Sequence, residues 1–246
     1  MIAILKKIAS AIITIVVVSC LVFIAFSVIP GDPAVAKLGT QATPEKLEAL
    51  RIKMGLNEPL LKRFVLWLSG IVRGDFSTSY SYSMSVNSLI AEKIPVTLIL
   101  ALYSLIIMIV ISIPVAVFAA RHKGDVIERT VTIINQVIMS IPPFFGGILI
   151  SLVFGMTLKL FTPGAYVSYS KNLGGFLAYM FFPALALALP KAAMAVSLLY
   201  TSIVDELKKD YVRTAYSRGN STKGVFYNNI LKNACIPVIT FLGMAI

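Results

Sequence analysis

Two glycines in the last part of the chain, Gly219 and Gly224, have the G-x-x-x-x-G spacing of a phosphate-binding loop. In such a loop a lysine that reaches the phosphates and a serine or threonine that binds magnesium follow the second glycine. Here Val225 and Phe226 follow instead, so both chemical groups are missing. The sequence therefore predicts that this chain does not bind ATP, and we expect no cofactor and no metal in it.

Other residue types that could perform covalent chemistry are isolated from one another. The single His122 has no histidine or cysteine near it, and we expect it to be an interfacial loop residue. Cys20 and Cys235 lie in or beside apolar runs, in neither a disulfide framework nor a metal-ligand spacing. Because the sequence also lacks HExxH, a nucleophile motif and paired carboxylates in its apolar runs, we expect a non-catalytic protein.

Lys191 is the one charged residue deep inside an apolar segment. It lies roughly 16 Å from the end of that segment near Ser202, at 1.5 Å per residue, which is farther than a lysine side chain reaches. An ionisable group at such depth is costly and by default indicates function. Two interpretations stay open: a cation of a transport pathway that meets an anionic substrate group, or a lysine paired with a backbone carbonyl or a partner subunit.

The elements that must position these residues are membrane helices. The chain is 58% hydrophobic and 13% charged, whereas soluble domains carry about 25% charged residues. Apolar runs of about 20 residues can cross a hydrocarbon core of about 30 Å. The sequence predicts an all-α, polytopic membrane protein whose first four spans cover roughly residues 8–29, 96–120, 131–158 and 176–202. Pro142 and Pro143 are expected to interrupt the third span, and a fifth apolar run begins at Ala234.

The distribution of basic residues predicts the orientation in the membrane. The net charge of +11 comes mostly from residues that flank apolar spans, which indicates membrane topology rather than nucleic-acid binding. Lys6, Lys7 and the short loops 121–130 and 205–232 are then cytoplasmic, so the N-terminus lies inside. We divide the chain into residues 1–29 (cytoplasmic N-terminus and first span), 30–95 (extracytoplasmic) and 96–246 (membrane core).

The extracytoplasmic region is expected to form short amphipathic helices. Thr43, Pro44 and Glu45 have the residue types of a helix start, and Gly55 is a plausible stop. A second helix is predicted to begin near Pro59.

The cytoplasmic loop at residues 203–233 is longer than a connection between two spans needs, and it is patterned as helix, break, helix. Gly219 is suited to the turn. Ala215 and Gly219, one helical turn apart, would let another surface approach closely, and Arg213 and Arg218 could bond acidic groups of a partner. The alternative is an interfacial loop whose basic residues touch lipid headgroups.

This loop reads Asp210-Tyr211-Val212-Arg213-Thr214-Ala215, with Arg218-Gly219 after it and Pro237 further on. It resembles the coupling loop of ABC-importer permeases, in the branch that transports dipeptides, oligopeptides or nickel. The resemblance extends over nearly the whole chain, through Gly31-Asp32-Pro33, Gly74-Asp75-Phe76 and Ile94-Pro95-Val96-Thr97-Leu98.

The resemblance implies a type I permease fold in the cytoplasmic membrane and a function as the transmembrane subunit of an ATP-driven importer. It also implies four kinds of partner: a second permease, expected to give a heterodimer, two ATPase subunits that bind ATP and magnesium, an external substrate-binding protein, and the lipid bilayer. The loop residues Asp210, Tyr211, Arg213, Ala215, Arg218, Gly219 and Pro237 are expected to serve coupling. Because the family has six spans, the chain is expected to be truncated within the fifth.

Three positions depart from the branch pattern: Ser77, Pro143 and Tyr200. The changes at Pro143 and Tyr200 could alter a pathway to which Lys191 and Pro142 are also assigned. The alternatives to an importer are an ion-coupled carrier and a membrane enzyme or assembly factor. An ion-coupled carrier usually shows acidic residues in its spans and internal repeats, and a membrane enzyme would need clustered polar groups at membrane depth. The sequence shows none of these features. Whether the substrate is a peptide or a metal chelate stays open.

Overall fold

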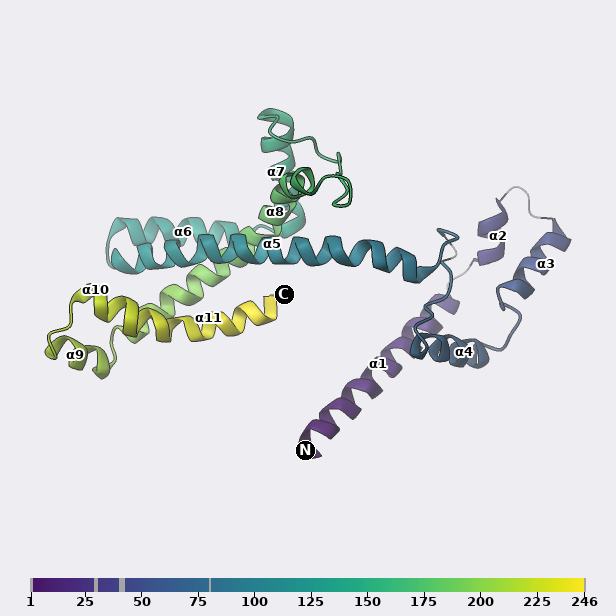
Figure 1. Cartoon of the computed structure of the whole chain (residues 1–246), viewed down its shortest axis with the longest axis horizontal. Coiled ribbons are helices and arrows are strands. Elements are labelled where there is room, and N and C mark those ends of the chain that lie inside the picture. The colour runs from purple at the N-terminus through teal and green to yellow at the C-terminus, as the bar shows by residue number, and fades with distance from the viewer. Residues whose placement is uncertain (1, 29–30, 40–42, 80, 246) are drawn as a thin grey trace. The chain divides into compact units, whose positions relative to one another are not determined.

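The computed structural model describes residues 2–28, 31–39, 43–79 and 81–245. Within these ranges the regular structure is helical, apart from one isolated antiparallel bridge between Thr78 and Ser85. The all-α fold class is therefore confirmed. The elements in chain order (Figure 1) are α1 (Ile2–Val28), α2 (Pro33–Leu38), α3 (Pro44–Lys53), α4 (Leu60–Val72), α5 (Val86–Arg121), α6 (Val126–Ser140), α7 (Pro143–Ile150), the π-helix η2 (Ser151–Thr157), α8 (Leu173–Glu206), α9 (Asp210–Ser217), α10 (Thr222–Val225), the π-helix η3 (Phe226–Ile230) and α11 (Leu231–Ala245).

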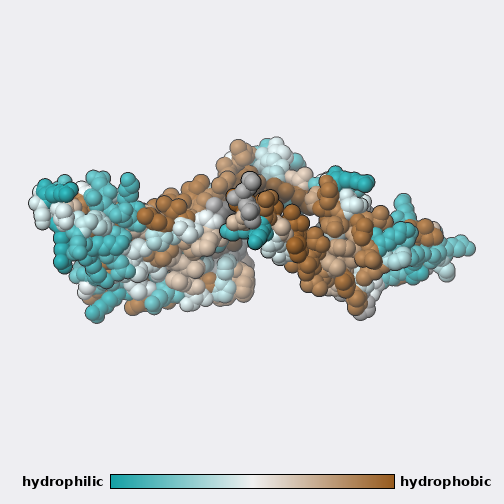
Figure 2. Space-filling view, turned by 90° about the horizontal axis from the view of Figure 1, so that it is seen from below, coloured by the Kyte–Doolittle hydropathy of each residue, from teal (hydrophilic) through white to brown (hydrophobic). Residues whose placement is uncertain are grey.

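Three helices of the described chain are long and apolar enough to cross a membrane: Ala3–Val28 of α1, all of α5, and all of α8. The pair α6 and α7–η2 provides a fourth crossing if it is counted as one broken span. Large hydrophobic side chains of these helices are exposed, and Figure 2 shows the broad hydrophobic surface that results. Such a surface requires lipid or a protein partner around it.

The chain divides into two compact units, Met1–Ile94 and Pro95–Ile246. In the first unit α4 packs against α1 through an aromatic cluster, in which the ring centroids of Phe23 and Phe64 lie 5.4 Å apart and those of Phe64 and Trp67 6.0 Å apart. Phe64 is the buried residue of α4. The predicted start of a helix beside Pro59 is confirmed, since Pro59 is the N-cap of α4.

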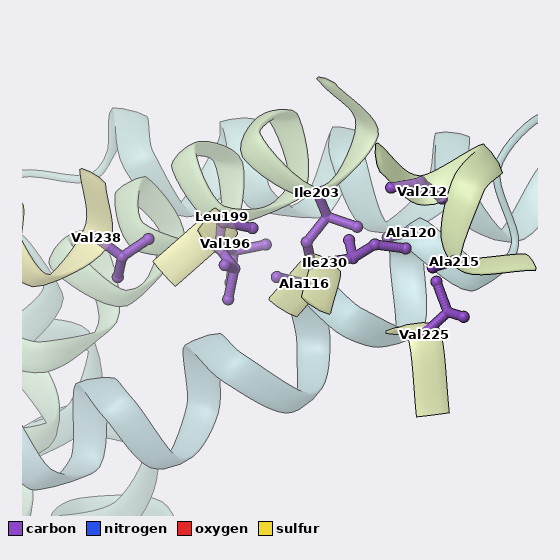
Figure 3. Packing of buried hydrophobic residues seen from close by; sticks show 11 residues of the cluster. Ala116, Ala120, Val196, Leu199, Ile203, Val212, Ala215, Val225, Ile230 and Val238 are labelled. Atoms are coloured by element: carbon purple, nitrogen blue, oxygen red, sulfur yellow. The ribbon is translucent and has the colours of Figure 1, made fainter. Parts of the chain in front are cut away.

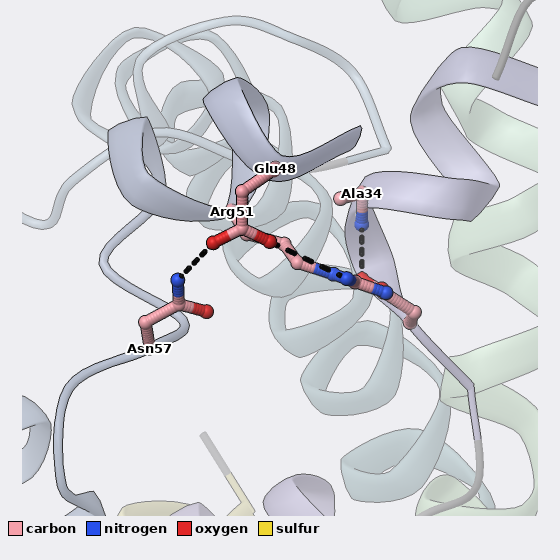
Figure 4. Close-up of polar contacts among 5 residues, drawn as sticks. Ala34, Glu48, Arg51 and Asn57 are labelled. Atoms are coloured by element: carbon pink, nitrogen blue, oxygen red, sulfur yellow. Dashed lines mark hydrogen bonds and ion pairs between the residues drawn. The ribbon is translucent and has the colours of Figure 1, made fainter. Parts of the chain in front are cut away.

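An ion pair between Asp32 and Arg51 connects the two short helices α2 and α3. Asp32 caps α2 by accepting a hydrogen bond of 2.8 Å from the Ala34 amide, and its other oxygen accepts one of 2.7 Å from Nε of Arg51 in α3 (Figure 4). The predicted start of α3 is confirmed, since the Thr43 hydroxyl accepts from the Lys46 amide at 3.4 Å. Its predicted stop is also confirmed, because Gly55, with φ +67°, follows the C-cap of α3.

Helices α5 and α8 extend beyond the predicted spans. Helix α5 begins at Val86 rather than at residue 96, and it runs through Pro95. Pro95 removes the hydrogen bond to the carbonyl of Ala91, but Ala91 is exposed, so water can satisfy that carbonyl. Helix α8 likewise extends from Leu173 to Glu206 and contains Pro183 and Pro190. Apolar run length thus predicted the central part of each helix and missed its ends.

The predicted interruption at Pro142 and Pro143 is confirmed. Helix α6 ends at Ser140, Pro142 is the N-cap of α7, and the helix axes before and after this break differ by 102°. After the break α7 packs on α8 through small residues: a Cβ added at Gly147 would lie 3.9 Å from Cβ of Ala186. Glycine and alanine allow this close helix contact, which in lipid replaces the hydrophobic effect as the source of attraction.

The core of the second unit lies where α5, α8, α9 and α11 meet (Figure 3). Its fully buried members include Leu199 and Ile203 of α8 and Val225 and Ile230 of the polar loop, each at 0% exposure. Alanines of α5, α9 and α11 surround them, so the backbones approach closely. This cluster is the support on which the polar loop rests.

Candidate functional site

Helix α9 is the centre of the polar loop, and its two faces differ. Val212 and Ala215 are 3% and 8% exposed and belong to the core cluster shown in Figure 3. Asp210 and Arg213 lie on the outer face, with side chains 97% and 81% exposed. The predicted helix is confirmed. The surface that the small side chain of Ala215 lets approach closely is the core of its own chain.

Helix α9 ends in a turn at Gly219. Arg218 is the C-cap, and Gly219 follows with φ +77°, a conformation that residues with a Cβ adopt only with strain. No atom lies within 4 Å of where a Cβ of Gly219 would be. The glycine is therefore required in this chain by its backbone angle, and not by crowding. Ser221 then begins α10 by accepting from the Gly224 amide at 3.2 Å.

Tyr211 ties α9 to the helices on either side of the loop. Its hydroxyl donates to Glu206 Oε2 at 2.6 Å, at the end of α8, and accepts from Nδ2 of Asn233 in α11 at 3.2 Å. Burial, together with the bond to Glu206, raises the pKa of the Tyr211 phenol. The phenol therefore stays protonated and keeps donating. A displacement of α9 is opposed by both α8 and α11.

Arg121, at the end of α5, makes a contact that sequence reasoning missed. Its guanidinium donates to the Tyr227 hydroxyl at 2.7 Å and lies 5.4 Å from the ring centroids of both Phe226 and Tyr227. Hydrogen bonding and cation–π attraction thus connect α5 to η3 in the second half of the loop. The sequence does show an aromatic pair, Phe226 and Tyr227, in an otherwise polar stretch. Its spacing does not predict that the partner is Arg121, 106 positions away.

Three hydrogen bonds, also unforeseen, join α6 to α8. The amide of Asn135, 7% exposed, donates to the carbonyl of Ala193 and to the hydroxyl of Ser197, both at 2.7 Å. Nearer the loop, the Tyr200 hydroxyl donates to Glu128. Tyr200 was assigned to the pathway, and the structure gives it this bond between helices. Asn135 could have been found as a polar residue within an apolar helix, which in membranes indicates an interhelical hydrogen bond.

The remaining predicted residues lie apart from the loop. Pro142 and Pro143 are exposed at the start of α7. Pro237 lies inside α11 and is exposed, so it belongs to the helix after the loop rather than to the loop itself. Lys191 lies in the middle of α8 and lines a cleft against α5. The structure therefore brings the predicted loop residues together, with the exception of Pro237, and places the pathway candidates elsewhere in the second unit.

Comparison with known proteins shows which family has this arrangement. Residues 112–246 match the family model of the binding-protein-dependent transport system inner membrane component, and residues 1–101 match that of the N-terminal part of such membrane components. The first match covers α9 and the core that supports it. The chain belongs to this family. The resemblance of the chain to ABC-importer permeases is thereby confirmed.

Individual members of the family are similar over most of their length. A putative peptide transport system permease protein of Brucella abortus is 32% identical, over 98% of this chain and 76% of its own. The oligopeptide transport system permease protein AppB of Bacillus subtilis is 30% identical, over 93% and 73%. The dipeptide transport system permease protein DppB of Lactococcus lactis is 27% identical, over 98% and 76%. The chain is accordingly a non-catalytic, multi-pass permease subunit of the cell membrane.

Proposed function

We propose that this permease is the transmembrane subunit of an ATP-driven importer of dipeptides or oligopeptides. The support for peptides is that the similar relatives carry the names of peptide, oligopeptide and dipeptide permeases. The sequence also left a nickel or other metal chelate open, but no observation favours it. The test is uptake by the complete transporter in vesicles, with a short peptide and a nickel chelate as competing solutes. Uptake of the chelate alone would contradict the peptide assignment.

The proposed route of coupling runs through α9 to partner ATPase subunits. The single observation that carries it is the two-faced construction of this helix: Val212 and Ala215 are fixed in the core, while Arg213 is exposed on the outer face. A protein that docks on the outer face can therefore push or pull α5, α8 and α11 together. Because this chain lacks a complete phosphate-binding motif, the energy has to come from such a partner.

The partner assembly follows from this role. A second permease subunit, expected to differ from this one, would cover part of the exposed apolar surface of α5 and α8. An external binding protein would deliver the solute, and two ATPase subunits would dock inside. With the N-terminus and the loop in the cytoplasm, as the basic residues predict, α9 faces the compartment that contains ATP.

The docking role is tested by charge reversal on the outer face. We expect the pair Arg213→Glu and Arg218→Glu to lower the amount of ATPase that co-purifies with the permease, and more strongly at low salt, where repulsion is less screened. The matched control reverses two basic residues of another loop, Lys159 and Lys171, which changes the net charge equally. Equal ATPase recovery from both variants at every salt concentration would place the arginines on lipid headgroups instead.

A further inference from the structure

Lys191 lines a cleft between α5 and α8, and it is the single basic residue within residues 96–120 of α5 and 173–204 of α8. The volume of the cleft is about 150 Å³. The lining side chains include those of Thr97, Ser104, Met108 and Lys191. All of them belong to the second compact unit, so the shape of the cleft does not depend on how the two units are placed.

The polar groups of the cleft come from one face of α5 and one position of α8. Thr97 and Ser104 are seven residues apart, two turns of helix, and therefore lie on the same side of α5. Met108, 2% exposed, continues that side as a buried apolar wall. The Ser104 hydroxyl donates to the carbonyl of Ala101 at 2.9 Å, a bond that rotation of the hydroxyl can exchange for one to a ligand.

The charge of the cleft is positive. Neither residues 96–120 of α5 nor residues 173–204 of α8 include an aspartate or glutamate, so Lys191 gives this part of the two helices a net positive charge. Lys191 is exposed in this chain, and the apolar side chains beside it in the cleft reduce the screening of its charge. An ammonium group and two hydroxyls that line one cleft are a combination that can bind carboxylate or phosphate oxygens.

We infer that Lys191, with Thr97 and Ser104, forms a subsite for an anionic group of the transported solute, namely the C-terminal carboxylate of a peptide. The inference rests on the proposed function for the identity of the solute. At about 150 Å³ the cleft is smaller than the roughly 300–1,000 Å³ pockets that hold whole small-molecule ligands, so it accommodates a carboxylate with its neighbouring atoms and not a whole peptide. The subsite would hold one end of the solute during passage.

The charge of the subsite can be measured without knowing the solute. In a complex whose permease has Cys20 and Cys235 replaced by serine, Ser104→Cys is exposed to an anionic and to a cationic methanethiosulfonate reagent, with and without ATP. We expect the anionic reagent to react about tenfold faster in at least one state, and Lys191→Gln to remove this preference, because a nearby unit charge shifts the local anion concentration by that order. Lys191→Arg should keep it.

The matched control is Leu102→Cys, two residues earlier on the opposite side of α5, where the side chain is 58% exposed. We expect no effect of Lys191 on this position. A site at Ser104 that is sealed in every state would overturn the inference, as would the same Lys191-dependent preference at Leu102. A preference that disappears when phosphatidylglycerol is added to phosphatidylcholine vesicles would show that lipid headgroups occupy the site, and would also overturn it.

Uptake then tests the carboxylate itself. With saturating binding protein in vesicles, trialanine and its C-terminal amide are compared in the wild-type complex and in Lys191→Gln. We expect the variant to lose most uptake of the free acid and little of the amide, while ATPase co-purification stays unchanged. An equal loss for both peptides would indicate a packing role and overturn the inference. If the wild-type complex imports neither peptide but imports a metal chelate, the proposed function fails instead, whatever the reagents report at Ser104.

Discussion

The hydroxyl of Tyr211 donates to Glu206 at 2.6 Å and so fastens the first residues of α9 to the end of α8. Through its second bond, from Asn233, the same oxygen reaches α11. One side chain thus joins three helices around the loop that we propose to be the docking surface. A force on α9 reaches two further helices without passing through a flexible connection.

Removing this hydroxyl should loosen the loop. Tyr211→Phe leaves the ring in place but deletes both bonds, which we expect to cost about 1 kcal/mol, because the site is partly exposed. The change is measured as a lower thermal unfolding midpoint in detergent and as weaker stimulation of ATPase activity by solute. Tyr216→Phe, at a tyrosine of α9 that is 41% exposed, is the matched control. Identical behaviour of the two variants would show that the three-helix contact has no role in coupling.

The backbone angle of Gly219 gives a second prediction. Because φ is +77°, a side chain there adds strain of about 1 kcal/mol or more. Asparagine tolerates this conformation better than leucine does. We expect Gly219→Leu to abolish uptake with normal membrane insertion, and Gly219→Asn to retain a large part of it. The space around the glycine is open, so volume alone does not explain a difference between the variants. Normal uptake by the leucine variant would contradict the assigned role of this turn.

The buried amide of Asn135 predicts a measurable coupling between α6 and α8. Asn135→Leu deletes the bonds to Ala193 and Ser197, at an expected cost of about 1 kcal/mol for a hydrogen bond between membrane helices. Ser197→Ala deletes only one of them. In a double-mutant cycle of thermal stability the two changes should be non-additive. Additive effects would indicate that the bond to Ser197 does not stabilise the helix pair.

The contact of Asp32 with Arg51 predicts acid sensitivity outside the membrane. The hydrogen bond from Arg51 holds the pKa of Asp32 below its ordinary value of 3.8. A carboxyl whose pKa is lower in the folded state stabilises that state above the unfolded pKa, and this contribution is lost as pH falls through the folded pKa. We therefore expect hydrogen exchange of α2 and α3, corrected for intrinsic rates, to rise from about pH 4 downward. Asp32→Asn should remove this pH dependence, and an unchanged profile would contradict the contact.

Much of this protein could be predicted from local pattern. Apolar runs fixed the membrane class and the centres of the spans, because about 20 apolar residues suffice to cross the hydrocarbon region. Residue types with strong backbone preferences fixed the break at Pro142 and Pro143 and the turn at Gly219. The sequence motif around Tyr211 and Arg213 was specific enough to indicate the family. Each of these signals is contained within one continuous segment of the sequence.

Only the tertiary structure shows which face of each helix packs against the rest of the chain. Ala215 has the same small side chain whether it faces a partner or its own core, and only the packing of α9 on α8 and α11 shows that it faces inward. The bonds of Arg121 to Tyr227 and of Asn135 to Ala193 connect residues 106 and 58 positions apart. Contacts over such separations depend on how helices are packed together, and helical periodicity within one segment carries no record of that packing.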